Sequence, residues 1–121
     1  MRIFIILSLV ALAVADITYF TTANDNIDLD TLMKNSERVK WYMDCFVDRR
    51  PCEPFSQSYK DNMVEAVSTA CLRCTLAQKS KWNQFLSGLK RDYPSEYEAF
   101  QKKYDPDNIY MVPFENAVAE Y

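Results

Sequence analysis

Residues 45–74 read CFVDRRPCEPFSQSYKDNMVEAVSTACLRC and contain all four cysteines of the chain. The spacing is C-x6-C-x18-C-x2-C, from Cys45 through Cys52 and Cys71 to Cys74. An even number of cysteines in a short exported chain is typical of a disulfide framework, whereas the same residues in a cytosolic chain more often bind a metal or react. The compartment of the protein therefore determines how this stretch is interpreted.

The N-terminus has the features of a secretory signal peptide. Arg2 supplies a short positive region, residues 3–15 are almost entirely apolar, and Ala13-Val14-Ala15 resembles a cleavage site. The apolar run is shorter than the roughly 20 residues that a membrane-spanning helix requires. We therefore expect a signal peptide over residues 1–15, no membrane span, and a secreted, extracellular single domain over residues 16–121.

Two disulfides are the favoured chemistry of the cysteines. Zinc binding by four thiolates would suit a cytosolic chain with two similar pairs, but the spacings here are unequal. Cys71-Leu72-Arg73-Cys74 resembles a thiol–disulfide exchange site, yet no βαβ pattern surrounds it. Four cysteines allow three pairings, and geometry favours the local one, Cys45 with Cys52 and Cys71 with Cys74. Residues three apart on a helix share a face with Cβ atoms roughly 5 to 6 Å apart, so the short pair needs little adjustment.

Hydrophobic periodicity indicates an all-α fold. The chain has one glycine, Gly88, and neither an Asn-Gly nor an Asp-Gly hairpin turn. Apolar residues recur instead at three- and four-residue spacing in five successive segments. These stripes are Leu29, Leu32 and Met33; Val39, Tyr42, Met43 and Phe46; Met63, Val67, Ala70, Cys71 and Cys74; Trp82, Phe85, Leu86 and Leu89; and Tyr97, Phe100 and Tyr104.

Polar residues and prolines predict where these helices begin. Asn35-Ser36 is a plausible cap pair before the second stripe, and Ser58 can cap the third helix. Pro94-Ser95, with Glu98 three residues after the serine, predicts a capping box before the last stripe.

The C-terminal segment is expected to pack on the helices. Asp105-Pro106-Asp107 ends the fifth helix, and the segment after it is apolar at Ile109, Tyr110, Val112 and Phe114. Pro113 should prevent an unbroken helix there, because proline lacks the backbone N–H and clashes with the preceding turn.

The residue inventory argues against catalysis. The chain contains no histidine, which is the commonest general base and metal ligand. The carboxylate pairs Asp28 with Asp30 and Glu96 with Glu98 stand at expected helix starts, where capping and dipole roles are favoured. Asp25, Asp28 and Asp30 lack the turn glycine and terminal glutamate of an EF-hand loop. We expect no enzyme, no catalytic residue, no cofactor and no metal site.

The charge of the chain argues against nucleic acid as a partner. The chain has 14 basic and 17 acidic residues and a formal net charge of −3, with its lysines interspersed among acids. A nucleic-acid interface needs a basic stripe or patch that contacts phosphates. The aromatic stripes fit either a packed core or the wall of a pocket, and periodicity cannot separate the two.

Four features together resemble the insect chemosensory proteins, also called the OS-D-like family. They are the cysteine spacing, the run Asp25-Asn26-Ile27-Asp28-Leu29-Asp30, the segment Tyr42-Met43-Asp44-Cys45 and the late Lys103-Tyr104-Asp105-Pro106. The resemblance extends from about Tyr19 to Glu115. It implies a compact bundle of about six short helices, with the two local disulfides, around an apolar channel.

The same resemblance implies a monomeric secreted carrier. Its partners would be hydrophobic small molecules such as semiochemicals, fatty acids, long-chain alcohols or esters, bound and transported without chemical turnover. The family's pocket positions fall on Tyr42, Phe46, Val67, Phe85, Leu86 and Leu89. Methionines could let the wall adapt to different guests, and two tyrosines stand where the family commonly has other aromatics. The expected ligand-binding residues are Tyr42, Met43, Phe46, Met63, Val67, Phe85, Leu86, Leu89, Tyr97 and Tyr110.

Two other functions remain open from the sequence. The protein could be a secreted interaction or signalling protein that acts through its surface and has a filled core. It could also be a thiol–disulfide catalyst at Cys71 and Cys74.

Overall fold

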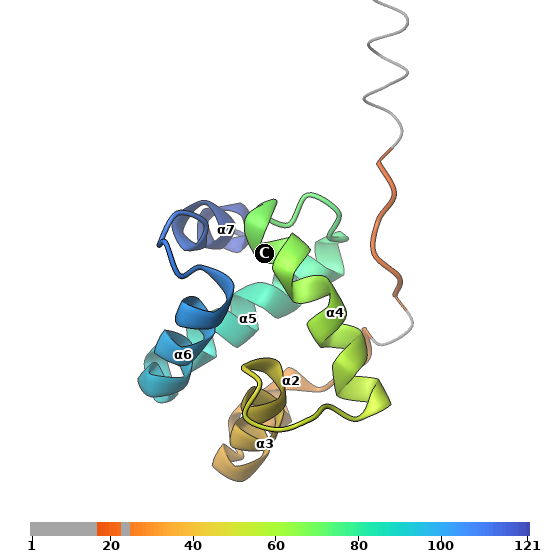
Figure 1. Ribbon diagram of the computed structural model, residues 1–121. Helices are drawn as coiled ribbons and strands as arrows, with labels where there is room; N and C mark the ends of the chain where they lie inside the picture. The colour runs from red at the N-terminus through yellow and green to blue at the C-terminus, as the bar shows by residue number, and fades with distance from the viewer. Residues whose placement is uncertain (1–16, 23–24) are drawn as a thin grey trace, which may run out of the picture.

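The computed structural model describes residues 17–22 and 25–121, and this part of the chain is all-α (Figure 1). The expected signal peptide lies outside the described residues. The expectation of an all-α bundle of about six helices is confirmed. The helices are α2 (Leu29–Met33), α3 (Ser36–Phe46), α4 (Pro54–Ser68), α5 (Leu76–Asp92), α6 (Pro94–Tyr104) and α7 (Met111–Val118).

The central helix of the bundle is α5, the longest, which contacts α2, α6 and α7. Gly88 permits the close approach of α2, because a Cβ atom at this position would lie 2.7 Å from Cε of Met33. Trp82 of α5 packs against Phe100 of α6 and Phe114 of α7, with ring centroids 6.0 and 5.0 Å apart. These contacts gather the apolar faces of three helices, α2, α6 and α7, around α5.

Both disulfides have the predicted pairing. Cys45 is bonded to Cys52, with Cα atoms 4.9 Å apart, and Cys71 to Cys74, with Cα atoms 5.1 Å apart. The first bridge closes the loop between α3 and α4, and the second closes the turn between α4 and α5. Each one therefore holds a bend rather than joining distant parts of the chain.

The predicted extent of the third helix is wrong at both ends. Helix α4 begins at Pro54, four residues before Ser58, because proline is favoured in the first helical turn where its missing N–H has no partner. It ends at Ser68, so Ala70, Cys71 and Cys74 lie in the following turn and not on a helix. The short disulfide thus forms in a turn, and not between two residues on one face of a helix as expected.

A Schellman motif ends α4. The backbone N–H of Cys71 donates to Ala66 O at 2.8 Å, and that of Ala70 to Val67 O at 3.5 Å. Ala70 and Cys71 have φ values of 53° and 62°, in the left-handed region that disfavours residues with a Cβ atom. The second disulfide therefore closes a turn whose backbone is unfavourable for its own residues.

Ala70→Gly is expected to stabilise the protein by about 0.5–1 kcal/mol, because glycine adopts the left-handed conformation without steric cost. The check is the thermal midpoint of unfolding with both disulfides intact, which should rise by several degrees. Ala99→Gly, in the interior of α6, is the matched control and should lower it. An equal fall for both variants would contradict the assignment of strain to Ala70.

The remaining helix starts are only partly as predicted. Asn35 caps α3, accepting from the backbone N–H of Arg38 at 3.2 Å, as expected. The capping box lies at Thr75 and Gln78, at the start of α5. The one predicted from Ser95 and Glu98 does not form, because α6 already begins at Pro94 and Ser95 lies inside its first turn.

The C-terminal segment forms a helix, contrary to expectation. Pro113 is the third residue of α7, where a backbone N–H would have no partner within the helix. Met111, Phe114 and Val118 face the core at 3%, 0% and 1% exposure. Of the four residues expected to dock, only Phe114 is buried, and the three exposed ones are Ile109, Tyr110 and Val112.

Candidate ligand-binding site

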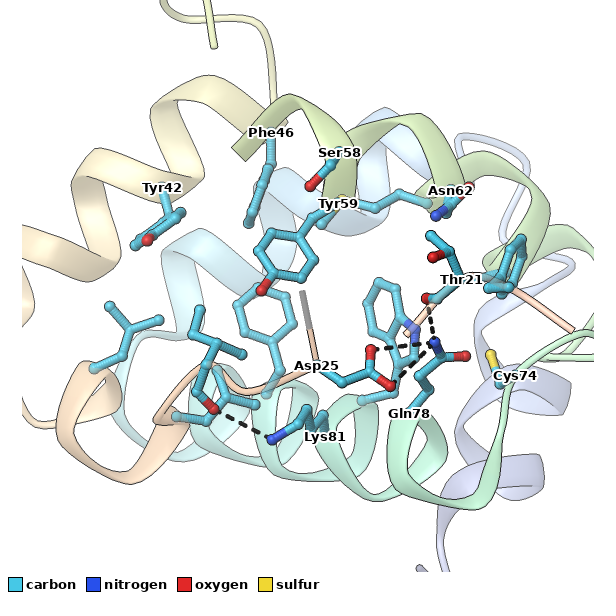
Figure 2. A pocket seen from close by; sticks show the side chains of 18 residues that line it. Thr21, Asp25, Tyr42, Phe46, Ser58, Tyr59, Asn62, Cys74, Gln78 and Lys81 are labelled. Atoms are coloured by element: carbon cyan, nitrogen blue, oxygen red, sulfur yellow. Dashed lines mark hydrogen bonds between the residues drawn. The ribbon is translucent and has the colours of Figure 1, made fainter. Parts of the chain in front are cut away.

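A cavity of about 140 Å3 lies between α2, α3, α4, α5 and the non-helical segment before α2 (Figure 2). We call this segment, residues 17–22 and 25–27, the N-terminal strap. Most of the wall is apolar or aromatic, and the polar groups come mainly from the strap, α4 and α5. The lining residues are Phe20, Thr21, Asp25, Ile27, Leu29, Leu32, Tyr42, Phe46, Ser58, Tyr59, Asn62, Met63, Ala66, Cys74, Gln78, Lys81, Trp82 and Phe85.

Helical spacing explains which residues reach the cavity. Tyr42 and Phe46 are one turn apart on α3, and Tyr59, Met63 and Ala66 follow the same spacing on α4. On α5, the lining residues Gln78, Lys81, Trp82 and Phe85 fall at i, i+3, i+4 and i+7. Each helix therefore presents one continuous stripe to the cavity.

Aromatic rings of α3 and α5 form part of the cavity wall. Phe85 lies edge-on to Phe46, with centroids 6.3 Å apart, and to Trp82, with centroids 6.0 Å apart. The ring centroids of Tyr42 and Phe46 are 5.9 Å apart. Such contacts hold the rings in place without filling the space between them.

Hydrogen bonds of its backbone attach the strap to α5 and to the turn between α4 and α5. Phe20 N–H donates to Arg73 O at 2.9 Å, and Gln78 Nε2 donates to Thr21 O at 2.9 Å. The Arg73 guanidinium lies 4.8 Å from the centroid of the Phe20 ring. Arg73 lies between Cys71 and Cys74, so the second disulfide fixes the residue that holds this wall of the cavity.

Polar groups give the cavity a second chemical character. The Asp25 carboxylate accepts from Gln78 Nε2 at 3.2 and 3.4 Å, and Lys81 Nζ donates to Ile27 O at 3.2 Å (Figure 2). Burial, and then the nearby Tyr42 and Asp25, raises the pKa of Tyr59 to about 12. At neutral pH the Tyr59 phenol is therefore protonated and can donate a hydrogen bond.

Four of the ten expected ligand-binding residues line the cavity, namely Tyr42, Phe46, Met63 and Phe85. Four others are buried in the core and do not reach it: Met43, Val67, Leu86 and Leu89, each 3% exposed or less. They point inward, as expected, but toward neighbouring helices rather than toward the open space.

The two remaining tyrosines also lie away from the cavity. The Tyr97 hydroxyl donates a hydrogen bond to the Glu115 carboxylate on α7. Burial is the main cause that raises the pKa of Tyr97, and the Glu115 carboxylate is the second. Tyr110 precedes α7 and is 38% exposed. Neither tyrosine is placed to contact a guest in this cavity.

The strap and the first half of α5 line the cavity, although the sequence pattern does not predict this for Phe20, Thr21, Asp25, Gln78 or Lys81. Phe20, Thr21 and Asp25 have no helical periodicity, so no pattern pointed to them. Gln78 and Lys81, by contrast, stand at i−7 and i−4 from Phe85, and this spacing could have identified them.

A comparison with known protein families identifies the family to which the chain belongs. The model of the insect pheromone-binding family A10/OS-D matches residues 20–112. The chain belongs to this family. The match covers the strap from Phe20 onward and all helices up to the start of α7, so it includes every residue that lines the cavity.

The chain is also similar in sequence to individual insect proteins. The chain is 33% identical to ejaculatory bulb-specific protein 3 of Drosophila melanogaster over 107 residues, 88% of this chain and 83% of that protein. It is 31% identical to allergen Tha p 1 of Thaumetopoea pityocampa over 87 residues, 72% of this chain and 69% of that protein.

A solved structure shares the fold. It is described as a chemosensory protein in complex with bromo-dodecanol, and it aligns with a TM-score of 0.73 and 25% sequence identity. The alignment covers 80% of this chain and 97% of that protein.

Proposed function

We propose that this protein is a secreted carrier that binds hydrophobic small molecules and releases them unchanged. The observation that carries the proposal is the cavity of about 140 Å3, lined mainly by apolar and aromatic side chains, in a member of a pheromone-binding family. The bromo-dodecanol complex of the structural relative supports a ligand with a long apolar chain and a small polar head. We further propose that residues 1–15 are a signal peptide and that the carrier is the domain over residues 16–121. In the described part of the chain no helix is long and apolar enough to cross a membrane.

Burial of an apolar chain supplies the binding energy. Each buried methylene contributes about 0.8 kcal/mol, so about ten methylenes can offset the cost of ordering and reach micromolar affinity. A cavity of about 150 Å3 holds a guest the size of benzene. A longer chain therefore requires the wall to move, and the strap, which has no helical backbone bonds, is the part best suited to do so.

The cavity argues against the two other functions left open by the sequence. A protein that acts only through its surface would have a filled core. A thiol–disulfide catalyst would expose a reactive cysteine, whereas Cys71 and Cys74 are only 1% and 3% exposed. The features present favour binding without turnover.

The carrier function can be tested through tryptophan fluorescence. Trp82 lines the cavity, whereas Trp41 is 41% exposed on α3 and does not. In a Trp41→Phe background, dodecanol is expected to change the Trp82 emission and to saturate with a dissociation constant in the micromolar range. The complementary Trp82→Phe protein, which keeps Trp41, should show little change. Absence of any response to dodecanol, dodecanoate and a long-chain ester would contradict the proposal.

A further inference from the structure

We propose that Lys81 binds the carboxylate head group of a long-chain fatty acid whose tail occupies the cavity. This inference rests on the proposed carrier function and names one class of ligand for the same site. It is carried by a cationic side chain in the wall of an otherwise largely apolar cavity.

Lys81 has hydrogen-bonding capacity left for a guest. Its Nζ donates to Ile27 O at 3.2 Å, and an ammonium group carries three donors. Lys60 and Lys90 pair with the carboxylates of Asp48 and Glu115, whereas Lys81 forms no ion pair within residues 17–22 and 25–121. A carboxylate that enters the cavity can complete the coordination of this ammonium.

The surroundings of Lys81 suit an amphiphile. Trp82 is the next residue on α5, and Phe85 lies one turn further along the same stripe. Leu29 and Leu32 of α2 line the same cavity just beyond Ile27, whose carbonyl Lys81 contacts. The head group would therefore lie where the strap meets α5, with the first methylenes of the tail beside apolar side chains.

Asp25 is the other charged group in the wall, and it could in principle select an amine instead. Its carboxylate accepts from Gln78 Nε2, on the side away from the Lys81 contact with Ile27 (Figure 2). Within the described residues the two charges do not pair, so neither neutralises the other. Because Asp25 already has a partner and the ammonium has donors to spare, the geometry favours an anionic head group.

The test compares three ligands with the same twelve-carbon chain at neutral pH: dodecanoate, dodecanol and dodecylamine. Binding is followed by Trp82 fluorescence in the Trp41→Phe background. Lys81→Met keeps an unbranched apolar side chain but removes the charge. This variant is expected to bind dodecanoate about tenfold more weakly than the wild type does, in line with the loss of one hydrogen bond to a charged group. Its affinity for dodecanol should fall by less than a factor of three. Lys81→Arg should restore most of the dodecanoate affinity.

Lys79→Met is the matched control, because Lys79 is on the same helix, does not line the cavity and contacts the Tyr121 ring. Asp25→Asn provides a measurement that does not depend on altering Lys81, and it is expected to strengthen dodecanoate severalfold by removing a repulsive charge. Equal loss of all three ligands in Lys81→Met, or tighter binding of dodecylamine than of dodecanoate, would overturn the assignment. If none of the three ligands binds, the carrier function fails and this inference falls with it, whereas binding of dodecanol without binding of dodecanoate overturns this inference alone.

Discussion

Replacement of Asp105 by alanine is expected to lower the thermal midpoint of unfolding by roughly 10 °C. Asp105 is fully buried between α6 and α7, and its carboxylate accepts from the backbone N–H groups of Ile109, Tyr110 and Met111 at 2.8, 3.0 and 2.9 Å. Alanine would leave these donors at the start of α7 without a partner. The measurement is calorimetric unfolding of the oxidised protein.

Asp107→Ala is the matched control, because Asp107 lies in the same connection and is exposed. It should change the midpoint by no more than a degree or two. A similar small change for Asp105→Ala would show that the three hydrogen bonds contribute little. Asp105→Ala should also disturb the cavity, because it destabilises α7. This helix carries Phe114, which packs against Trp82 in the cavity wall.

The same carboxylate predicts a dependence of stability on pH. Burial raises the pKa of Asp105, but the three backbone hydrogen bonds together lower it by more than burial raises it. The pKa of Asp105 therefore lies below its ordinary value of 3.8. A group with a depressed pKa in the folded state stabilises the protein above its unfolded pKa, and this contribution is lost as the pH falls through the folded pKa. Urea unfolding between about pH 5 and pH 2 should therefore show a larger loss of stability for the wild-type protein than for Asp105→Asn.

Ala66→Leu is expected to weaken the binding of dodecanol by about fiftyfold while leaving the fold intact. Ala66 is fully buried on α4 and lines the cavity, so leucine would place three extra carbon atoms in the space that a guest occupies. Displacing about three methylenes removes roughly 2.4 kcal/mol of binding energy. Alanine and leucine are both strong helix formers, so α4 itself should be unaffected.

The measurement is the dissociation constant from Trp82 fluorescence, together with the unfolding midpoint of each variant. Ala77→Leu is the matched control, since Ala77 is exposed on α5 and does not line the cavity. It should bind dodecanol as the wild type does. If Ala66→Leu retains full affinity at an unchanged midpoint, the guest binds elsewhere.

The helices that the sequence predicted most securely are those with a long periodic stripe. Val39, Tyr42, Met43 and Phe46 all face inward on α3, and Phe85, Leu86 and Leu89 do so on α5. Boundaries were less predictable, because Ser58 and Ser95 look like caps while the prolines before them already begin the helix. The pairing of the cysteines was predictable from short spacing alone, although Cys71 and Cys74 occupy a turn.

The cavity was the least predictable feature. Met43 and Phe46 lie on the same face of α3, yet Phe46 borders the open space and Met43 is enclosed by other side chains. Periodicity reports only that a residue faces inward. Whether it meets a void or a neighbour depends on how far apart the helices are held, which no single segment encodes.

The all-α class, the two local disulfides and most of the inward-facing residues follow from the order of residues along the chain, since each depends on contacts within a few residues. The folded bundle, by contrast, sets which inward faces line the cavity, makes the N-terminal strap one of its walls, and places Lys81 and Asp25 in that wall. These features depend on the strap meeting α5 more than 50 residues later in the chain, as in the contacts of Gln78 with Thr21 and Lys81 with Ile27. Such a meeting is set by the packing of the whole bundle.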